Sequence, residues 1–183
     1  MPSPRFTYLQ HIIRTAAQLE REWLGKAPPE DRRFTPWMPF PVPAYVALLA
    51  EAIPDAPVCR FLEIGAGPGS KMLIARELFG LQVQGIEINP EYARQAVNLG
   101  LHVMTGDAAD FGDYRAYDLI WFHRPFRDPD SQAVLEKRVW DDMAPGAVVI
   151  CANLEGPPPQ DRFHIILDDQ EIRRGIYLKS PLP

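Results

Sequence analysis

The stretch FLEIGAGPGS, residues 61–70, joins an apolar, strand-like run to three glycines at alternate positions. Glycine weakens the interior of a helix or strand, so Gly65, Gly67 and Gly69 indicate a tight turn or a backbone that a ligand approaches closely. The residues that follow the turn have helical spacing. A strand that enters a helix through such a turn is typical of a nucleotide-like ligand, because backbone donors and the helix dipole point at it.

The composition is that of an ordinary globular protein, with 183 residues, 46% hydrophobic residues and a net charge of -5. This charge provides no general attraction to nucleic acid or to anionic lipid. The sequence has neither a secretory signal nor a membrane-length apolar run, so we expect a cytoplasmic protein without a membrane partner. Cys59 and Cys151 lie in strand-like runs and are expected to be buried thiols. No Cys/His cluster has metal-ligand spacing, so no metal is expected.

Helices and strands are expected to alternate along the chain. The expected helices are 6–24, 44–53, 70–79, 90–99 and 131–143, and the expected strands are 58–64, 83–88, 102–105, 117–122, 147–152, 162–167 and 175–179. Strands that alternate with helices of about ten residues predict an α/β fold: a Rossmann-like, doubly wound, mostly parallel sheet of seven strands.

Both ends of the chain depart from this alternation. Only nine residues, three of them consecutive prolines, separate the strand 147–152 from 162–167, which is too short for a crossover helix. We therefore expect 162–167 to run antiparallel to the sheet and to form an antiparallel C-terminal hairpin with 175–179. Residues 1–43 are expected to form an N-terminal helical, proline- and aromatic-rich cover, and residues 44–183 the cofactor-binding domain.

In an open α/β sheet, ligands bind beyond the carboxyl ends of the strands, where the strand order switches. The loops expected at that edge carry Glu63, Glu87, Asp107, His123 and Arg124. An acid about 20 residues beyond the first glycine can accept hydrogen bonds from ribose hydroxyls. The glycine pattern departs from the dinucleotide-binding fingerprint at its sixth position, Ser70, and Glu63 suits a ligand with an ammonium group rather than a pyrophosphate.

At this point the sequence resembles the class I S-adenosylmethionine-dependent methyltransferases. The resemblance covers about residues 44–152 and rests on five ordered segments: FLEIGAGPGS, GIEINP, GDAADF, YDLIWFHRPF and MAPGAVVI. It implies S-adenosyl-L-methionine as the cofactor and methyl transfer as the reaction. The cofactor-binding residues that it implies are Glu63, Gly65, Ala66, Gly67, Gly69, Glu87, Ile88, Asp107 and Ala108.

The resemblance also implies a role for each acid. Glu63 would hold the amino group, Glu87 the ribose, and Asp107 the adenine amino group, with Ile88 and Ala108 as apolar walls of the adenine site. The residues alone leave simpler roles open. The glycines could serve only the turn, Glu87 could be a surface acid at a strand end, and Asp107 or Glu63 could cap the segment that follows it.

The fourth loop departs from the family. Many members that methylate nitrogen have Asn or Asp, two prolines and an aromatic residue there, whereas this chain has His123, Arg124, Pro125 and Phe126. A histidine with a pKa near 6.5 suits proton removal at neutral pH, so His123 is a candidate general base, with Arg124 orienting the acceptor. Equally, the two residues could hold the loop through hydrogen bonds.

An acceptor pocket is expected near Trp37, Met38, Phe40 and Tyr45, beside Arg32–Arg33, although these aromatic residues could instead pack the N-terminal helix. The chain has no strong basic face, so we expect a small-molecule acceptor and have no indication of nucleic acid. Three other functions stay open: an aminocarboxypropyl transferase that uses the same cofactor, a non-catalytic module that binds it, and, less favoured, an NAD(P)-binding oxidoreductase.

Overall fold

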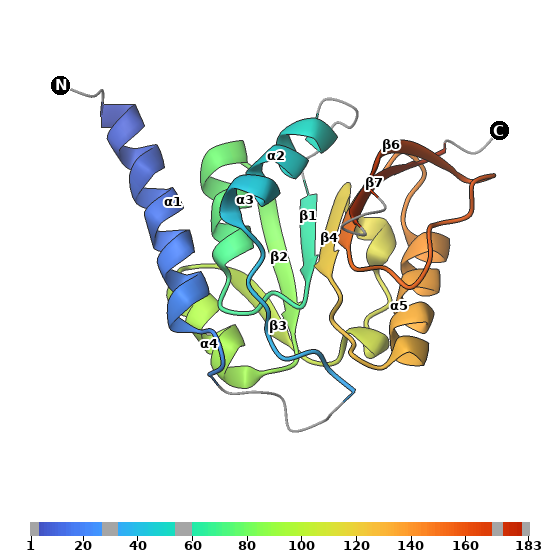
Figure 1. Cartoon of the computed structure of the whole chain (residues 1–183), viewed down its shortest axis with the longest axis horizontal. Coiled ribbons are helices and arrows are strands. Elements are labelled where there is room, and N and C mark those ends of the chain that lie inside the picture. Colours follow the sequence, from blue (N-terminus) through green and yellow to red (C-terminus); the bar gives the residue numbers. More distant parts are fainter. Residues whose placement is uncertain (1–3, 27–32, 54–59, 170–173, 181–183) are drawn as a thin grey trace.

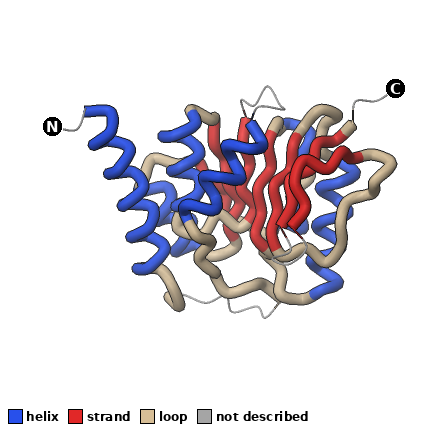
Figure 2. Tube along the Cα trace, turned by 45° about the horizontal axis from the view of Figure 1, so that its top comes forward, coloured by secondary structure: helices blue, strands red, loops and turns tan. Residues whose placement is uncertain are grey.

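The computed structural model describes residues 4–26, 33–53, 60–169 and 174–180. Figures 1 and 2 show one twisted sheet with helices on both faces. The strands are β1 (Arg60–Ile64), β2 (Gln82–Glu87), β3 (His102–Thr105), β4 (Leu119–His123), β5 (Val148–Ala152), β6 (Phe163–Asp169) and β7 (Arg174–Lys179). The helices are α1 (Pro4–Glu22), α2 (Val42–Ala52), α3 (Ser70–Phe79), α4 (Pro90–Asn98) and α5 (Pro129–Asp142), with short 3₁₀ turns η2 (Ala108–Asp110) and η3 (Tyr114–Ala116).

The sheet has the strand order β3-β2-β1-β4-β5-β7-β6, and β1 to β5 are parallel. The chain runs outward from β1 to β3 and then returns to pair β4 with β1. The loops after β1 and β4 therefore leave the sheet in opposite directions, which opens a crevice between them. This arrangement confirms the predicted Rossmann-like, doubly wound, mostly parallel sheet.

The C-terminal hairpin is confirmed, but the expected direction of its first strand is wrong. β7 pairs antiparallel with both β5 and β6, so β6 runs in the same direction as β5. No helix is needed for this return, because β6 lies one strand position beyond β7 rather than next to β5. The proline-containing residues 153–162 are long enough to pass along the sheet and leave space for β7 between the two parallel strands.

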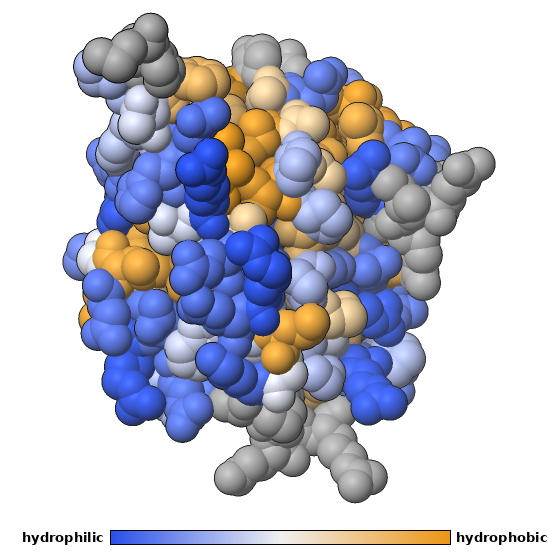
Figure 3. All heavy atoms as spheres, turned by 60° about the vertical axis from the view of Figure 1, so that its left-hand side comes forward, coloured by the Kyte–Doolittle hydropathy of each residue, from blue (hydrophilic) through white to orange (hydrophobic). Residues whose placement is uncertain are grey.

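The two faces of the sheet bury separate hydrophobic cores. Alternate strand residues such as Phe61 and Trp121 pack against α1 to α4, whereas Leu62 and Phe122 pack against α5 and the 3₁₀ turns. Figure 1 places α1 at one end of the molecule, beside α3 and α4, and the β6–β7 hairpin at the other end. The outer face of α1 (Figure 3) is mostly hydrophilic and is interrupted by apolar patches.

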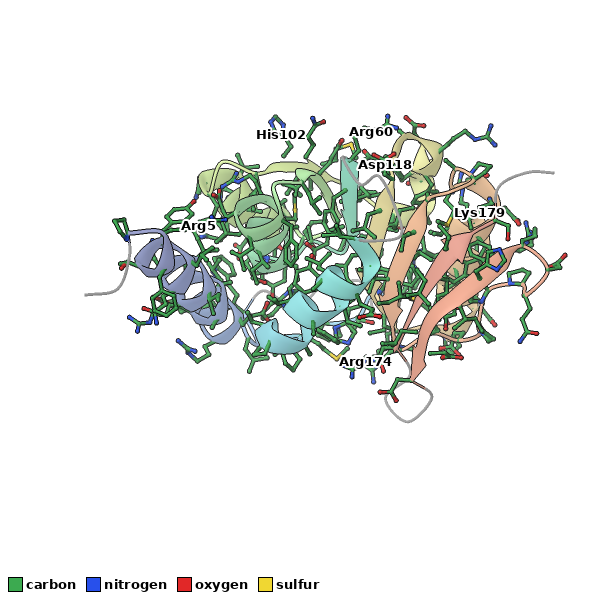
Figure 4. All side chains as sticks on the ribbon, turned by 90° about the horizontal axis from the view of Figure 1, so that it is seen from above. Arg5, Arg60, His102, Asp118, Arg174 and Lys179 are labelled. Atoms are coloured by element: carbon green, nitrogen blue, oxygen red, sulfur yellow. The ribbon has the colours of Figure 1, made fainter. Side chains whose placement is uncertain are left out.

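The amino edge of the sheet lies opposite the crevice. Figure 4 looks onto this edge, where Arg60 and Asp118 lie together. The backbone N–H of Arg60 donates to Asp118 at 2.8 Å, and the two side chains form an ion pair at 3.5 Å. Cys151 is buried as expected, whereas Cys59 lies outside the described residues. None of the described helices has the length and apolar character that crossing a membrane requires.

Candidate active site

The glycine turn connects β1 to α3 at the carboxyl edge of the sheet. Gly65, Gly67 and Gly69 all have positive φ, at 77°, 54° and 87°, which side chains with a β-carbon rarely adopt. Gly69 has a second constraint, because an added β-carbon would lie 2.9 Å from the β-carbon of Ala96 and 2.6 Å from Leu101. The third glycine therefore allows α3 to pack closely on α4, and the first two shape the turn.

Glu87 at the end of β2 is joined to the glycine turn. One carboxylate oxygen accepts from the backbone N–H of Gly67 at 2.7 Å, and the other accepts from that of Asn89 at 2.8 Å. Burial raises the pKa of Glu87, while the backbone donors act in the opposite direction. A carboxylate oxygen can accept more than one hydrogen bond, so Glu87 can hold the turn and still bind a hydroxyl in the crevice.

A segment from the N-terminal part of the chain covers this edge. We call residues 33–41 the strap. Phe34 forms a β-bridge with Phe126, the Thr35 N–H donates to the carbonyl of Pro125 at 3.0 Å, and that of Arg127 donates to Arg33 at 2.7 Å. These bonds attach the strap to the loop after β4, and it thereby becomes the outer wall of the crevice.

The crevice has a volume of about 810 Å³, part of which is open to solvent. Seven of the predicted site residues line it: Glu63, Gly65, Glu87, Ile88, Ala108, His123 and Arg124. Of the expected acceptor residues, Trp37, Met38 and Phe40 line it as well. Tyr45 instead is fully buried and packs on Trp121, with ring centroids 5.1 Å apart, and Arg32 lies outside the described residues.

The other predicted residues lie just outside the crevice walls. Ala66, Gly67 and Gly69 form the buried side of the turn. Asp107 accepts from the Ala109 N–H at 2.8 Å, which caps η2. Its other oxygen lies 3.6 Å from the guanidinium of Arg33 on the strap. Asp107 therefore has the capping role that the sequence left open, beside the crevice-lining Ala108.

Glu63 is a buried acid with an unpaired oxygen. Only 3% of the residue is exposed, and its Oε2 atom has no hydrogen-bond partner among the described residues. Burial raises the pKa of Glu63 well above its usual value, and the nearby acids Glu20 and Glu87 act in the same direction, whereas Lys71 and a hydrogen bond with the Trp121 side chain lower it. The crevice therefore presents a carboxyl group that a bound cation would stabilise in its charged form.

Lys71 and Ser70 begin α3 and both bond to Glu20 of α1. The Lys71 ammonium forms a buried ion pair with Oε1 of Glu20, and the Ser70 hydroxyl donates to the same oxygen. Oε2 of Glu20 has no partner among the described residues. The ion pair thus lies near Glu63, an acid with one unpaired oxygen, at the start of α3.

His123 and Arg124 at the end of β4 contact the loop after β5. The amide Nδ2 of Asn153 lies 2.9 Å from Nε2 of His123, and Arg124 donates to the Asn153 carbonyl at 3.1 Å and pairs with Glu155. Burial is the main cause that lowers the pKa of His123 to about 4, with a smaller effect from Lys71. At neutral pH the imidazole is uncharged, and it accepts from the Asn153 amide at Nε2.

Sequence reasoning missed four residues of this site: Glu20, Lys71, Asn153 and Glu155. One signal was available for Glu20, because it lies four positions after the buried Ala16 and therefore on the buried face of α1. A charged residue on an apolar helix face needs a buried partner. Asn153 and Glu155 are brought to Arg124 only by the pairing of β5 with β4, which no local pattern shows.

No protein-family model and no curated protein sequence matches the chain. Among solved structures, an RNA methyltransferase from Salinibacter ruber in complex with S-adenosyl-L-homocysteine has a TM-score of 0.61 and 20% identity, over 80% of this chain and 97% of that one. A mutant of MtNAS in complex with S-adenosylmethionine has a TM-score of 0.57 and 18% identity, over 97% and 76%.

Phosphoethanolamine N-methyltransferase 2 from Haemonchus contortus, in complex with phosphomonomethylethanolamine and S-adenosylhomocysteine, is also similar. Its TM-score is 0.53 and its identity 20%, over 71% of this chain but only 31% of the other. These likenesses show the fold. The chain has the Rossmann-like fold of class I S-adenosylmethionine-dependent methyltransferases.

Proposed function

We propose that the chain binds S-adenosyl-L-methionine in the crevice and transfers its methyl group to a small-molecule acceptor. The observation that carries the proposal is the 2.7 Å bond between Glu87 and the N–H of Gly67, which joins a ribose-type acid to a turn of three positive-φ glycines. The cofactor, when bound, would supply an electrophilic methyl group on a sulfonium centre, whose sulfur leaves as a neutral thioether when a nucleophile takes the methyl group.

The crevice residues fit this cofactor. The unpaired, buried oxygen of Glu63 can accept from an ammonium group, and Glu87 can accept from ribose hydroxyls. Ile88 and Ala108 supply apolar walls for an adenine ring. Asp107 does not line the crevice and already caps η2 through the Ala109 N–H. These residues would act by holding the cofactor in one orientation, since methyl transfer depends on in-line alignment and on the exclusion of water.

The acceptor would bind between the strap and the loop after β4. Phe40 packs edge-on against both Trp121 and His123, with centroid distances of 5.1 and 5.2 Å, which forms an aromatic wall beside the imidazole. This covered, aromatic-lined site favours a small molecule over a macromolecule.

We propose that His123 contacts the acceptor. With Nε2 accepting from Asn153, the ring proton lies on Nδ1, and the imidazole can donate a hydrogen bond to an acceptor atom. A role as general base requires Asn153 to release Nε2 first. Arg124 would orient an anionic or carbonyl group of the acceptor, although Glu155 already neutralises much of its charge.

Isotope-labelled cofactor tests the reaction. S-adenosylmethionine labelled either in the methyl carbon or in the carboxyl carbon is incubated with the protein and candidate acceptors. Methyl label in the product, without carboxyl label, is the expected result. Transfer of the carboxyl label would assign aminocarboxypropyl transfer, and binding without transfer of either label to any acceptor would favour a non-catalytic module. Binding of NAD instead of S-adenosylhomocysteine would favour an oxidoreductase.

A further inference from the structure

The charged cluster beneath the glycine turn has more hydrogen-bonding capacity than the protein uses. Glu20 and Lys71 come from α1 and α3, and Glu63 comes from β1. All three side chains are more than nine-tenths buried. A buried carboxylate oxygen without a partner is destabilising, yet Oε2 of Glu20 and Oε2 of Glu63 both lack a partner among the described residues.

Lys71 also has unused donors. Its ammonium makes one hydrogen bond to the described residues, to Oε1 of Glu20, and has three hydrogens to donate. Lys71 and Glu63 both line the crevice, whereas Glu20 does not. Lys71 and Glu63 therefore place a cation and an acid at the wall of the crevice, and Glu20 anchors the cation from the protein side.

A ligand that satisfies this arrangement carries both charges. The ammonium group of such a ligand would donate to the unpaired Oε2 of Glu63, and its carboxylate would accept from the free donors of Lys71. Charge-assisted hydrogen bonds of this kind are roughly twice as strong as those between neutral groups. A single free cation would satisfy Glu63 and leave Lys71 as it is, so the cluster favours a zwitterion over a simple amine.

We propose that Lys71 and Glu63 together bind the amino-acid end of the cofactor, and that Glu20 of α1 is a positioning residue that holds Lys71 for this task. The inference rests on the proposed cofactor and deepens it, because it assigns recognition of the cofactor's carboxylate to Lys71. It also makes α1 part of the cofactor site. The N-terminal helix then contributes to affinity through Glu20 as well as to packing.

Three nucleosides separate the parts of the site. S-adenosylhomocysteine has the complete tail, its decarboxylated analogue lacks only the carboxylate, and 5′-methylthioadenosine lacks the whole amino-acid group. Their affinities are measured by calorimetric titration for the wild type, Lys71→Met and Glu20→Gln. Lys137→Met serves as the matched control, because Lys137 is an exposed lysine on α5 that pairs with Asp141.

The expected result is selective. Lys71→Met should weaken the binding of S-adenosylhomocysteine by about tenfold or more, because only this ligand loses a hydrogen bond between its carboxylate and Lys71. The affinities of the other two nucleosides should stay within about twofold of the wild type. Glu20→Gln should weaken the binding of S-adenosylhomocysteine by a smaller factor. Lys137→Met should leave the affinities of all three nucleosides unchanged. If Lys71→Met does not fold, the double variant Glu20→Gln/Lys71→Met, which removes both charges of the buried ion pair, replaces it.

Three outcomes overturn parts of this scheme separately. Equal weakening of all three nucleosides by Lys71→Met, or no weakening of any, would refute the role of Lys71 and leave the cofactor proposal standing. Failure of every nucleoside to bind the wild type would refute the proposed function itself. Preserved selectivity in Glu20→Gln, with unchanged affinity for S-adenosylhomocysteine, would remove Glu20 from the site.

Discussion

The indole of Trp37 lies directly against the α-carbon of Gly67, so that a β-carbon at position 67 would overlap the indole ring. The strap and the glycine turn are therefore in contact at a point where only glycine fits. Trp37 also lies near Tyr92 of α4, with ring centroids 6.3 Å apart, which fixes the strap over the turn. The strap, which is the outer wall of the crevice, is thus packed directly on the glycine turn.

This contact predicts the effect of Gly67→Ala. The substitution combines a φ of 54° with a steric overlap, so we expect the free energy of unfolding to fall by about 1–3 kcal/mol. Affinity for S-adenosylhomocysteine should fall too, because Glu87 accepts from the N–H of Gly67. Urea unfolding and calorimetric titration measure the two effects.

Gly80→Ala is the matched control for this prediction. Gly80 has a φ of 70° but no atom within 4 Å of an added β-carbon, so its substitution reports the conformational cost alone. Gly67→Ala should be more destabilising than this control in the wild type, and in the Trp37→Ala background it should cost no more than Gly80→Ala. Equal losses at positions 67 and 80 would show that the indole contact contributes nothing.

The ribose-binding role of Glu87 predicts a change in sugar discrimination. In the wild type, adenosine should bind more tightly than 2′,3′-dideoxyadenosine, because only adenosine has hydroxyls for the carboxylate. Glu87→Ala should remove this preference for adenosine and so lower the ratio of the two affinities by about tenfold or more. It should also destabilise the turn, because the hydrogen bonds to Gly67 and Asn89 are lost. Competition titration of the two nucleosides measures the ratio, and an unchanged ratio in Glu87→Ala would contradict the assignment.

Much of this fold could be predicted because its signals are local. Periodic apolar residues, the glycines after α3 and α4 and the proline at the start of α4 locate most elements to within about two residues. The direction of β6 could not be predicted in this way. It depends on which strand position the C-terminal segment takes, and β7, which comes later in the chain, occupies the position beside β5.

The residues of the site likewise fall into those that local sequence signals predict and those that only the tertiary structure brings together. The glycine turn, Glu63 and Glu87 follow directly from strand ends, whose place at one edge of a parallel sheet is known once the strands are known. Lys71 meets Glu20 only because α1 packs along α3, fifty-one positions away in sequence. Asn153 has a φ of 59°, which asparagine adopts more readily than most residues, but Arg124 has a φ of 45°, an unusual backbone conformation that its residue type does not reveal.

The burial of Glu63 predicts a stability gain from its removal. Because the folded-state pKa lies well above the ordinary value of 4.5, the folded protein retains a proton that the unfolded chain releases. This stabilising effect is present below pH 4.5 and is lost as the pH rises. Glu63→Gln should therefore unfold at a higher temperature than the wild type above pH 4.5, with a difference that grows with pH.

The same variant should bind S-adenosylhomocysteine more weakly. If the ligand's ammonium ionises Glu63, binding to the wild type should release protons, and Glu63→Gln should not. Calorimetry in two buffers of different ionisation enthalpy detects the release. A more stable variant with undiminished affinity would show that Glu63 does not contact the ligand.

The lowered pKa of His123 predicts a stability loss in mild acid. The unfolded chain binds a proton at its ordinary pKa of 6.5, whereas the folded protein does so only at a pKa of about 4. Stability from this group is therefore complete above pH 6.5 and is lost as the pH falls toward 4, by at most about 1.4 kcal/mol per unit. The difference in free energy of unfolding between wild type and His123→Gln should narrow over this window, and a pH-independent difference would contradict the shift.

Lys179 predicts a purely structural effect, away from the crevice. Its ammonium donates to the carbonyls of Trp140, Asp141 and Met143 at 2.8–2.9 Å, which caps the C-terminus of α5 from β7. Lys179→Met removes all three bonds and leaves carbonyls unpaired, so the free energy of unfolding should fall by about 2 kcal/mol. Lys137→Met, on the exposed face of the same helix, should change the free energy of unfolding by less than about 0.5 kcal/mol.

Since α5 lies on the opposite face of the sheet from Glu20 and Lys71, the nucleoside affinity of folded Lys179→Met should equal that of the wild type. Urea unfolding with calorimetric titration tests both statements, and a loss of affinity at full folding would show that α5 and the crevice are coupled.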